Sequence, residues 1–130
     1  MILLDTHVVV WLALSPAKIS RAARETIEEA RRRADALAIS DITLLELATL
    51  AHKSRIRLTL SLESFLVEVE SRFAVLPMNG QVCARSLQFP AGYPKDPADR
   101  VIAATAMVHG LPLITADSEI RRFKALQTIW

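Results

Sequence analysis

The chain has 130 residues, of which 52% are hydrophobic, and its 16 lysines and arginines against 14 aspartates and glutamates give a net charge of +2. This length and composition predict one globular domain over residues 1–130 and exclude a disordered or acidic solvating segment. The single cysteine excludes a disulfide framework and a cysteine-based zinc site, and it predicts a reducing, cytoplasmic environment. No apolar run is long enough to span a bilayer, so we expect no membrane partner. The small net charge leaves nucleic-acid binding open without arguing for it.

Short apolar runs alternate along the chain with segments of helical spacing. Strands are predicted at residues 2–4, 36–39, 73–76 and 111–115, and residues 128–130 are a candidate for a terminal edge strand. Helices are predicted at residues 7–14, 20–33, 41–53, 61–72, 80–87 and 96–109, and a last helix begins at Asp117 or Ser118. Ser20, Asp41 and Asp96 are expected to be N-caps, and residues 89–94 to form a turn-rich loop.

Short apolar strands separated by helices pair in parallel, with helices on both faces of the sheet. The expected fold class is therefore α/β, as a three-layer α/β/α sandwich with a short, mainly parallel sheet of four to five strands. In such sheets ligands bind beyond the carboxyl ends of the strands, which is where we look for chemistry.

Carboxylates recur at these strand ends. Asp5 directly follows the first strand, and Glu46 lies in the helix after the second. Asp96 and Asp99 open the helix before the fourth strand, and Asp117 follows that strand by two residues. If these acids converge, their mutual repulsion favours a bound cation, and an oxygen-only set of ligands suits Mg²⁺ or Mn²⁺ rather than Zn²⁺.

Each of these acids could also have a purely structural role. Asp5, Asp96 and Asp117 could cap helices, and Glu46 could be an exposed helix residue. The capping role is favoured for Asp96, whereas both roles stay open for Glu46 and Asp117. A position in a cleft is favoured for Asp5, because it closes a fully apolar strand. It is also favoured for Asp99, because that residue heads the helix face that must pack on the sheet.

Four segments, taken together, resemble a known family. Residues 2–12, 39–48, 96–106 and 113–117 are similar, in order and approximate spacing, to the motifs of PIN-domain ribonucleases, specifically the VapC-type toxins of bacterial toxin–antitoxin pairs. The resemblance covers nearly the whole chain. It implies an endoribonuclease that hydrolyses RNA phosphodiester bonds with Mg²⁺ or Mn²⁺. One departure is His7, where many members carry asparagine, and it leaves the role of that side chain open.

The resemblance also implies roles for individual residues and partners. The positions that match the family's acidic quartet are Asp5, Glu46, Asp99 and Asp117, the supporting hydroxyls are Thr6 and Thr115, and Asp96 matches an additional carboxylate. The implied partners are an RNA substrate, a small antitoxin protein that covers the site, and a second copy of the chain in a homodimer. Since the site itself is anionic, RNA must be attracted by cations around it, and the candidates are Lys53, Arg55, Arg57, Arg100, Arg121, Arg122 and Lys124.

The main alternative is a catalytically inactive PIN-like domain that only binds RNA or protein, and the presence of all four acids favours catalysis over it. Two classes of aspartyl-phosphate protein are disfavoured by single positions. A haloacid-dehalogenase-type phosphatase would need an aspartate where the chain has His7, and a response-regulator receiver would need an acid after the third strand. The three histidines lack metal-ligand spacing, and Cys83 is expected to lie in the core.

Overall fold

The sheet in the computed structural model, which describes residues 1–93 and 95–130, has five strands. They are β1 (Ile2–Leu4), β2 (Leu37–Ser40), β3 (Ala74–Leu76), β4 (Leu113–Ile114) and β5 (Thr128–Ile129), in the spatial order β3-β2-β1-β4-β5. Every adjacent pair is parallel. The predicted parallel sheet is confirmed, including the terminal edge strand.

Helices connect these strands, as the spacing of apolar residues predicts. They are α1 (Thr6–Leu14), the 3-10 turn η1 (Pro16–Lys18), α2 (Arg21–Arg32), α3 (Asp41–His52), α4 (Leu62–Arg72), α5 (Gly80–Ser86), α6 (Pro97–His109) and α7 (Ser118–Arg121). Of these, the sequence does not predict η1. Gly110, at φ 63°, ends α6 in the left-handed conformation that glycine adopts without strain. The predicted loop 89–94 ends at Pro94, which lies outside the described residues.

One predicted helix cap is wrong by one residue. The N-cap of α3 is Ser40, whose hydroxyl accepts a hydrogen bond from the Ile42 amide. Asp41 is the first helical residue instead, and its Oδ2 accepts a hydrogen bond of 3.0 Å from the Met78 amide. The aspartate therefore ties the start of α3 to the chain that follows β3, a contact that the local sequence does not reveal. The caps at Ser20 and Asp96 are confirmed.

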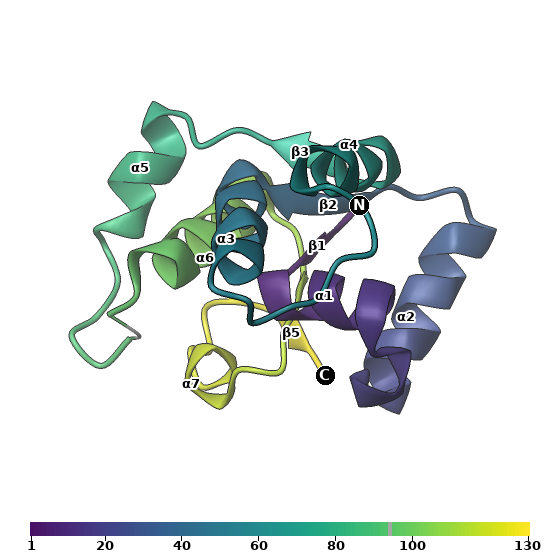
Figure 1. Ribbon diagram of the computed structural model, residues 1–130. Helices are drawn as coiled ribbons and strands as arrows, with labels where there is room; N and C mark the ends of the chain where they lie inside the picture. The colour runs from purple at the N-terminus through teal and green to yellow at the C-terminus, as the bar shows by residue number, and fades with distance from the viewer. Residues whose placement is uncertain (94) are drawn as a thin grey trace.

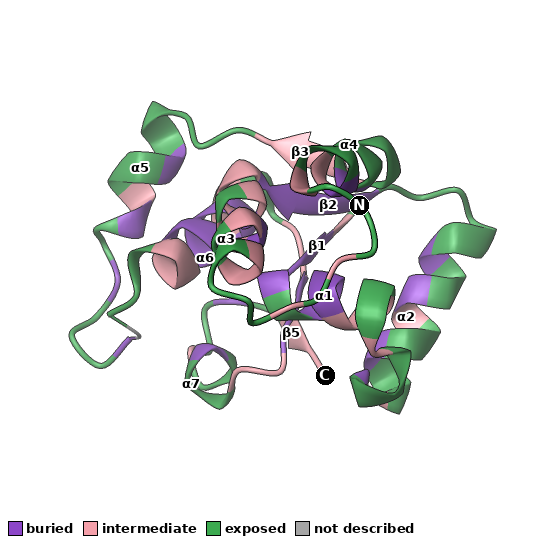
Figure 2. Cartoon of the chain, in the orientation of Figure 1, coloured by how far each residue is buried: buried purple, intermediate pink, exposed green. Residues whose placement is uncertain are grey.

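Side chains of the strands alternate between two cores, as a sheet covered on both faces requires. Leu4, Ile39 and Ile114 lie in one core with residues of α1, α2 and α4. Leu3, Ala38 and Leu113 lie in the other core with residues of α5, α6 and α7. Figure 1 shows α2 and the pair α5–α6 on opposite sides of the strands, and Figure 2 shows β1, β2 and the inner face of α6 buried. The three-layer sandwich is confirmed.

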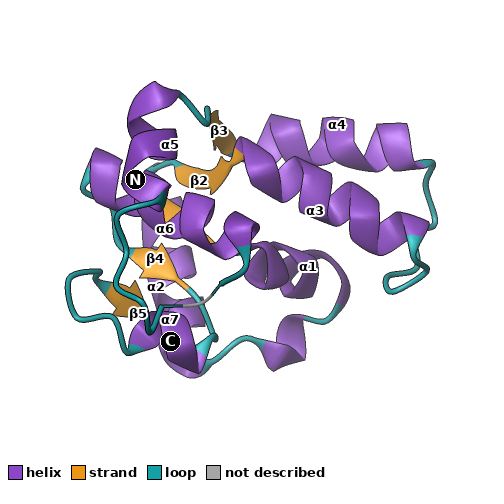
Figure 3. Ribbon diagram, turned by 90° about the vertical axis from the view of Figure 1, so that its left-hand side faces the viewer, coloured by secondary structure: helices purple, strands orange, loops and turns teal. Residues whose placement is uncertain are grey.

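Two expectations about burial are wrong. The largely apolar sequence of α3 predicts a helix that is buried except for its polar strip, yet Leu45 is 62% exposed and only Thr43 and Leu47 are buried in that helix. The reason is that α3 and α4 extend side by side away from the sheet (Figure 3), so the outer face of α3 has no layer above it. Cys83 is exposed rather than in the core, because α5 buries Val82 and Ser86 on its inner face.

The described helices include none with the length and hydropathy needed to cross a bilayer.

Candidate active site

Asp5 lies where β1 ends, at the carboxyl edge of the sheet. The register of the sheet pairs Leu4 with Ile114, so the residues that follow β1 and β4 meet. Asp5 is only 5% exposed, and its two oxygens are both engaged. Oδ1 accepts a hydrogen bond of 2.8 Å from the Thr6 amide, and Oδ2 accepts one of 2.8 Å from the Thr115 hydroxyl. Asp5 therefore caps α1 and also lies at the crevice, so the two roles that the sequence allows for it are compatible.

The hydroxyl of Thr115 joins two of the predicted carboxylate positions. It donates to Asp5 and accepts a hydrogen bond of 3.1 Å from the Asp117 amide. Asp117 in turn is the N-cap of α7, where its Oδ1 accepts a hydrogen bond of 2.9 Å from the Glu119 amide. The orientation of Asp117 is therefore fixed by its own helix cap and by the threonine two residues before it.

A second threonine orients Glu46 on α3. The Thr6 hydroxyl donates a hydrogen bond of 2.5 Å to Glu46 Oε1 and lies 3.0 Å from the Thr43 hydroxyl. Because a hydroxyl has one hydrogen, Thr43 must be the donor in the second contact. Thr43 is completely buried, and it was not predicted from the sequence. Its spacing of three residues from Glu46 on the same helix face was the available signal.

Asp96 and Asp99 come from the start of α6. Asp96 caps this helix through a hydrogen bond of 2.8 Å that Oδ1 accepts from the Ala98 amide. Asp99 is half-buried, and desolvation raises its pKa to about 7, with further increases from the charges of Asp5, Asp96, Glu46 and Asp117. The charges of the other four carboxylates therefore act on Asp99.

Burial also raises the pKa of the two carboxyls that the threonines orient. For Asp5, desolvation outweighs the hydrogen bonds from Thr115 and Thr6, which lower the pKa. For Glu46, desolvation outweighs the hydrogen bond from Thr6, and the charge of Asp5 raises the pKa further. His7 lowers both pKa values by its charge. The hydrogen bonds around Asp5 and Glu46 therefore do not fully compensate for burying their negative charge.

A divalent cation is the group that this donor set fits. Carboxylate and hydroxyl oxygens are the ligands that Mg²⁺ and Mn²⁺ prefer, and a cation would relieve the repulsion that raises the pKa of Asp99. Within residues 1–93 and 95–130, no three of the His, Cys, Asp and Glu side chains are gathered tightly enough to hold an ion on their own. A Mg²⁺ ion commonly keeps several waters and is held by one or two carboxylates, so the donor set still fits such an ion.

A pocket of about 460 Å³ opens beside these acids. It is lined by residues of α1, α3 and the start of α6, which include Thr6, His7, Glu46, Thr49, Lys53, Arg55 and Asp96. Two of the predicted RNA-binding cations, Lys53 and Arg55, are thus brought to the edge of the site. Arg121, Arg122 and Lys124 line a different pocket, Arg100 lies beside Asp99 on α6, and Arg57 is exposed on the loop after α3.

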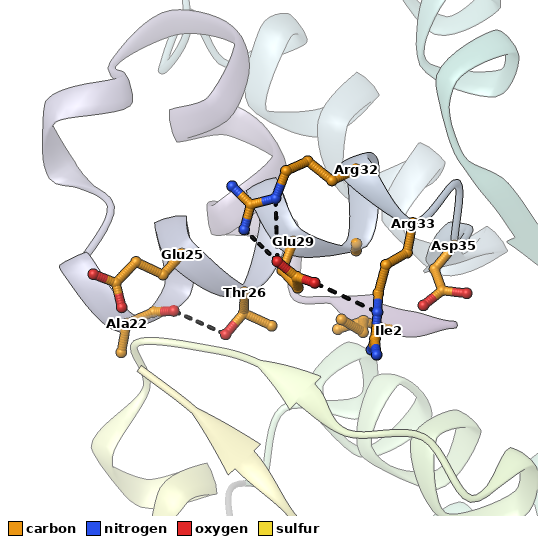
Figure 4. A pocket seen from close by; sticks show the side chains of 9 residues that line it. Ile2, Ala22, Glu25, Thr26, Glu29, Arg32, Arg33 and Asp35 are labelled. Carbon is orange, nitrogen blue, oxygen red and sulfur yellow. Dashed lines mark hydrogen bonds and ion pairs between the residues drawn. The ribbon is translucent and has the colours of Figure 1, made fainter.

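A larger pocket, of about 590 Å³, lies along α2 (Figure 4) and is not a candidate for the active site. It is lined by Ile2 at the amino end of β1, the opposite end of this strand from Asp5. Both of its arginines are already engaged, since Glu29 forms ion pairs with Arg32 and Arg33. Exposed ion pairs of this kind are a common feature of helix surfaces.

One further buried polar group is the Tyr93 hydroxyl. Tyr93 is 5% exposed, its ring stacks on Phe89 at 4.3 Å, and its hydroxyl has no hydrogen-bond partner among the described residues. Desolvation raises the pKa of Tyr93, and the charge of Asp99 is the next largest cause. The sequence offers no signal for this residue, because it lies in a loop without periodicity.

Known proteins are similar to this chain in sequence and in fold. The profile of the PIN domain family matches residues 2–126. Ribonuclease VapC22 of Mycobacterium tuberculosis is 37% identical over 131 aligned residues, which cover 99% of this chain and 98% of the relative.

Solved structures agree with that relationship. The crystal structure of DNA-bound VapBC from Salmonella typhimurium contains a chain that is 28% identical, with a TM-score of 0.69, and the match covers 98% of this chain and 97% of the other. The structure of VapBC2 from Rickettsia felis, bound to a DNA fragment from its promoter, matches with a TM-score of 0.74 at 21% identity, over 98% and 97% of the two chains. The latter shows likeness of fold alone.

Proposed function

This chain belongs to the PIN domain family, and on that basis we propose that it is a metal-dependent endoribonuclease and the toxin of a toxin–antitoxin pair. The observation that carries the proposal is the position of Asp5 and Asp117 at one edge of the sheet, where the Thr115 hydroxyl contacts the carboxylate of the first and the amide of the second, with Glu46 held nearby by Thr6. A relative at 37% identity is named as a ribonuclease, and a solved structure at 28% identity is a VapBC complex, which supports the proposed activity and the proposed toxin role.

The four acids Asp5, Glu46, Asp99 and Asp117 would hold Mg²⁺ or Mn²⁺. A divalent cation bound there would neutralise charge on an RNA phosphate and lower the pKa of water, so that no side chain need act as a nucleophile. The hydroxyls of Thr6 and Thr115 keep Glu46 and Asp5 oriented toward the cation through the hydrogen bonds described above. The side chains of the protein then serve to hold the cation and to keep its ligands in position.

Cations at the edge of the site complete the proposed mechanism. The acids alone would repel an RNA strand, whereas Lys53 and Arg55 line the same pocket as Glu46 and Asp96. We propose that both contact phosphates of the substrate and hold the strand against the acids. Asp96 contributes negative charge near Asp99 and caps α6, so it supports the site without needing to be a ligand.

Purified variants test this function directly. We expect Asp5→Asn and Asp99→Asn to remain folded and to lose RNA cleavage, and we expect EDTA to stop cleavage by the unsubstituted protein and Mg²⁺ or Mn²⁺ to restore it. Asp35→Asn makes the same chemical change in the α2 pocket and should cleave normally. Cleavage that persists in EDTA would contradict the metal mechanism. Binding of RNA without cleavage under all conditions would favour a catalytically inactive domain.

The proposal includes protein partners. A pocket of about 260 Å³ between α1 and α4 is lined by apolar residues such as Leu12, Phe65 and Phe73, and by Arg31 and the ion pair of Arg72 with Glu68. We propose this surface for the antitoxin, because the apolar face of an amphipathic helix would match its apolar lining.

Self-association is the second partner proposal. Leu45 on α3 and Val67 on α4 are 62% and 64% exposed, on two helices that pack together, and we propose that they belong to an apolar patch that contacts a second copy of the chain. Light scattering of the purified protein would measure the mass in solution. A dimer that Leu45→Lys converts to a monomer would support this contact, and a wild-type monomer would contradict it.

We further propose that the protein acts in the cytoplasm.

A further inference from the structure

A row of aromatic rings leads away from the carboxylates. His7, which lines the pocket beside Glu46, has its ring centroid 6.1 Å from that of Trp11, one turn later on α1. Trp11 lies 5.6 Å from Trp130, which follows β5. The planes of successive rings are tilted by 50° and 48°. Residues from the two ends of the chain therefore form one continuous aromatic strip, which begins at the active site.

The strip ends at a basic pocket. This pocket, of about 380 Å³, is lined by Ser118, Arg121, Arg122, Lys124, Thr128 and Trp130, and none of these residues is acidic. The pocket is also attached to the active site through α7, because Asp117 caps this helix and Arg121 lies one turn further along it. Figure 1 shows α7 and β5 below α1, on the side of the molecule where β1 leads into α1.

The two tryptophans are held in place by the fold. Both are partly buried and pack against the core that contains Leu4 and Ile114. Anchored rings with an exposed part lose little conformational entropy when a flat ligand stacks on them. The three cations beside them come from the end of α7 and the segment that follows it, and all three line one pocket with Trp130.

We propose that this strip, formed by His7, Trp11 and Trp130, together with the basic pocket of Arg121, Arg122 and Lys124, binds a single-stranded segment of the RNA that enters the active site. The proposal rests on the ribonuclease function proposed above. Bases stack on the rings and phosphates contact the cations, which is how proteins hold single strands without reading their sequence. Paired bases in a duplex are not free to stack on protein rings, so the surface selects an unpaired strand.

A protein partner fits this surface less well. The pocket of Arg121, Arg122 and Lys124 is lined by cations and hydroxyls, whereas the apolar pocket that suits a partner helix lies between α1 and α4. The basic pocket adjoins the ring strip at Trp130, and the pocket beside Glu46 and Asp96 adjoins it at His7, so the strip connects the cations to the acids. Charge complementarity thus favours the RNA strand as the occupant.

Intrinsic tryptophan fluorescence can test this proposal without an added label. Trp11 and Trp130 are its two tryptophans, so intrinsic tryptophan fluorescence observes this surface alone. In the cleavage-deficient Asp99→Asn variant, we expect a short single-stranded oligouridylate to quench that fluorescence in a saturable and salt-dependent way. The same length of RNA duplex should quench much less. Equal binding of the duplex, or quenching by a protein partner and not by RNA, would overturn the proposal.

A matched pair of substitutions separates stacking from packing. Trp130→Phe keeps a ring, whereas Trp130→Leu keeps an apolar side chain without one. Both are made in the Asp99→Asn background, with thermal unfolding as the check that they fold. We expect Trp130→Phe to bind the oligonucleotide nearly as well as its parent, and Trp130→Leu to bind about 5- to 100-fold more weakly, the loss typical of one stacked base. Equal affinity of the two variants would overturn the stacking role.

The basic pocket is tested in the same way. The double variant Arg121→Gln, Arg122→Gln should weaken binding at low salt and reduce the dependence of affinity on salt. An unchanged salt dependence would overturn the role of these cations. The result can distinguish this RNA-binding proposal from the proposed ribonuclease activity. If Trp130→Leu cleaves RNA normally while Asp5→Asn is inactive, only the RNA-binding role of this surface is overturned. Absence of cleavage in the unsubstituted protein would overturn only the activity, since quenching is measured without it.

Discussion

The Thr115 hydroxyl donates a hydrogen bond of 2.8 Å to Asp5 Oδ2, although the two residues are 110 positions apart in the chain. Both side chains are buried, and they follow adjacent strands. The threonine thereby fixes the buried carboxylate of Asp5. Its hydroxyl also accepts a hydrogen bond from the Asp117 amide. Removing this hydroxyl leaves one buried acceptor and one backbone donor without their partner.

Thr115→Val removes the hydroxyl and keeps the shape of the side chain. We expect the free energy of unfolding to fall by about 1–3 kcal/mol, the usual result when a buried polar group loses its partner. Thr115→Ser retains the hydroxyl and should restore the hydrogen bond, with a smaller loss from the missing methyl group. Urea unfolding of the three proteins measures the difference. Equal stability of the valine and serine variants would mean that the hydrogen bond contributes nothing.

The pKa of Asp99 predicts how stability depends on pH when no metal is present. Its ordinary value is 3.8 and its value in the folded protein is about 7, so between these values the folded state holds more protons than the unfolded state. The free energy of unfolding must then decrease as the pH rises from about 4 to about 7 through the contribution of this residue. Burial shifts Asp5 and Glu46 in the same direction.

Asp99→Asn isolates this contribution. Urea unfolding in EDTA at pH 5 and pH 8 should show a smaller decrease for the variant than for the parent protein. Excess Mg²⁺ should reduce the decrease in the parent, because a bound cation stabilises the charged carboxylates. A parent protein whose stability changes with pH as in the variant would show that Asp99 has an ordinary pKa.

Much of this site could be predicted because the signals are local. Apolar strands followed by Asp5 and Asp117, and an acid at the head of the buried face of α6, place carboxylates at one edge of the sheet without any tertiary information. Thr43 has only a weak signal, its spacing of three residues from Glu46, and Tyr93 has none, because their roles depend on contacts with distant parts of the chain. The error at Cys83 has a similar origin, since α5 is short and the sequence alone does not say which face of it turns inward.

Asp96 has two roles that one pair of substitutions separates. Asp96→Asn keeps an oxygen that caps α6 and removes the charge, so stability should be nearly unchanged while the pKa of Asp99 falls. Asp96→Ala removes both, and we expect a loss of about 1 kcal/mol from the missing cap. Urea unfolding and an NMR titration of the Asp99 carboxyl measure the two effects. An unchanged pKa of Asp99 in both variants would contradict the electrostatic coupling.

Tyr93 carries a buried hydroxyl that has no partner among the described residues, and this predicts an unusual response to substitution. Tyr93→Phe removes a polar group that burial has already separated from water, while the ring keeps its stacking on Phe89 and its edge contact with Phe123 at 5.2 Å. We expect the free energy of unfolding to stay the same or to rise by up to about 1 kcal/mol. Tyr93→Leu is the matched control, because it loses the ring contacts and should destabilise the protein. A clear loss of stability in Tyr93→Phe would mean that the hydroxyl does form a stabilising hydrogen bond in the folded protein. The raised pKa of Tyr93 would then have a further cause besides burial and the neighbouring acids.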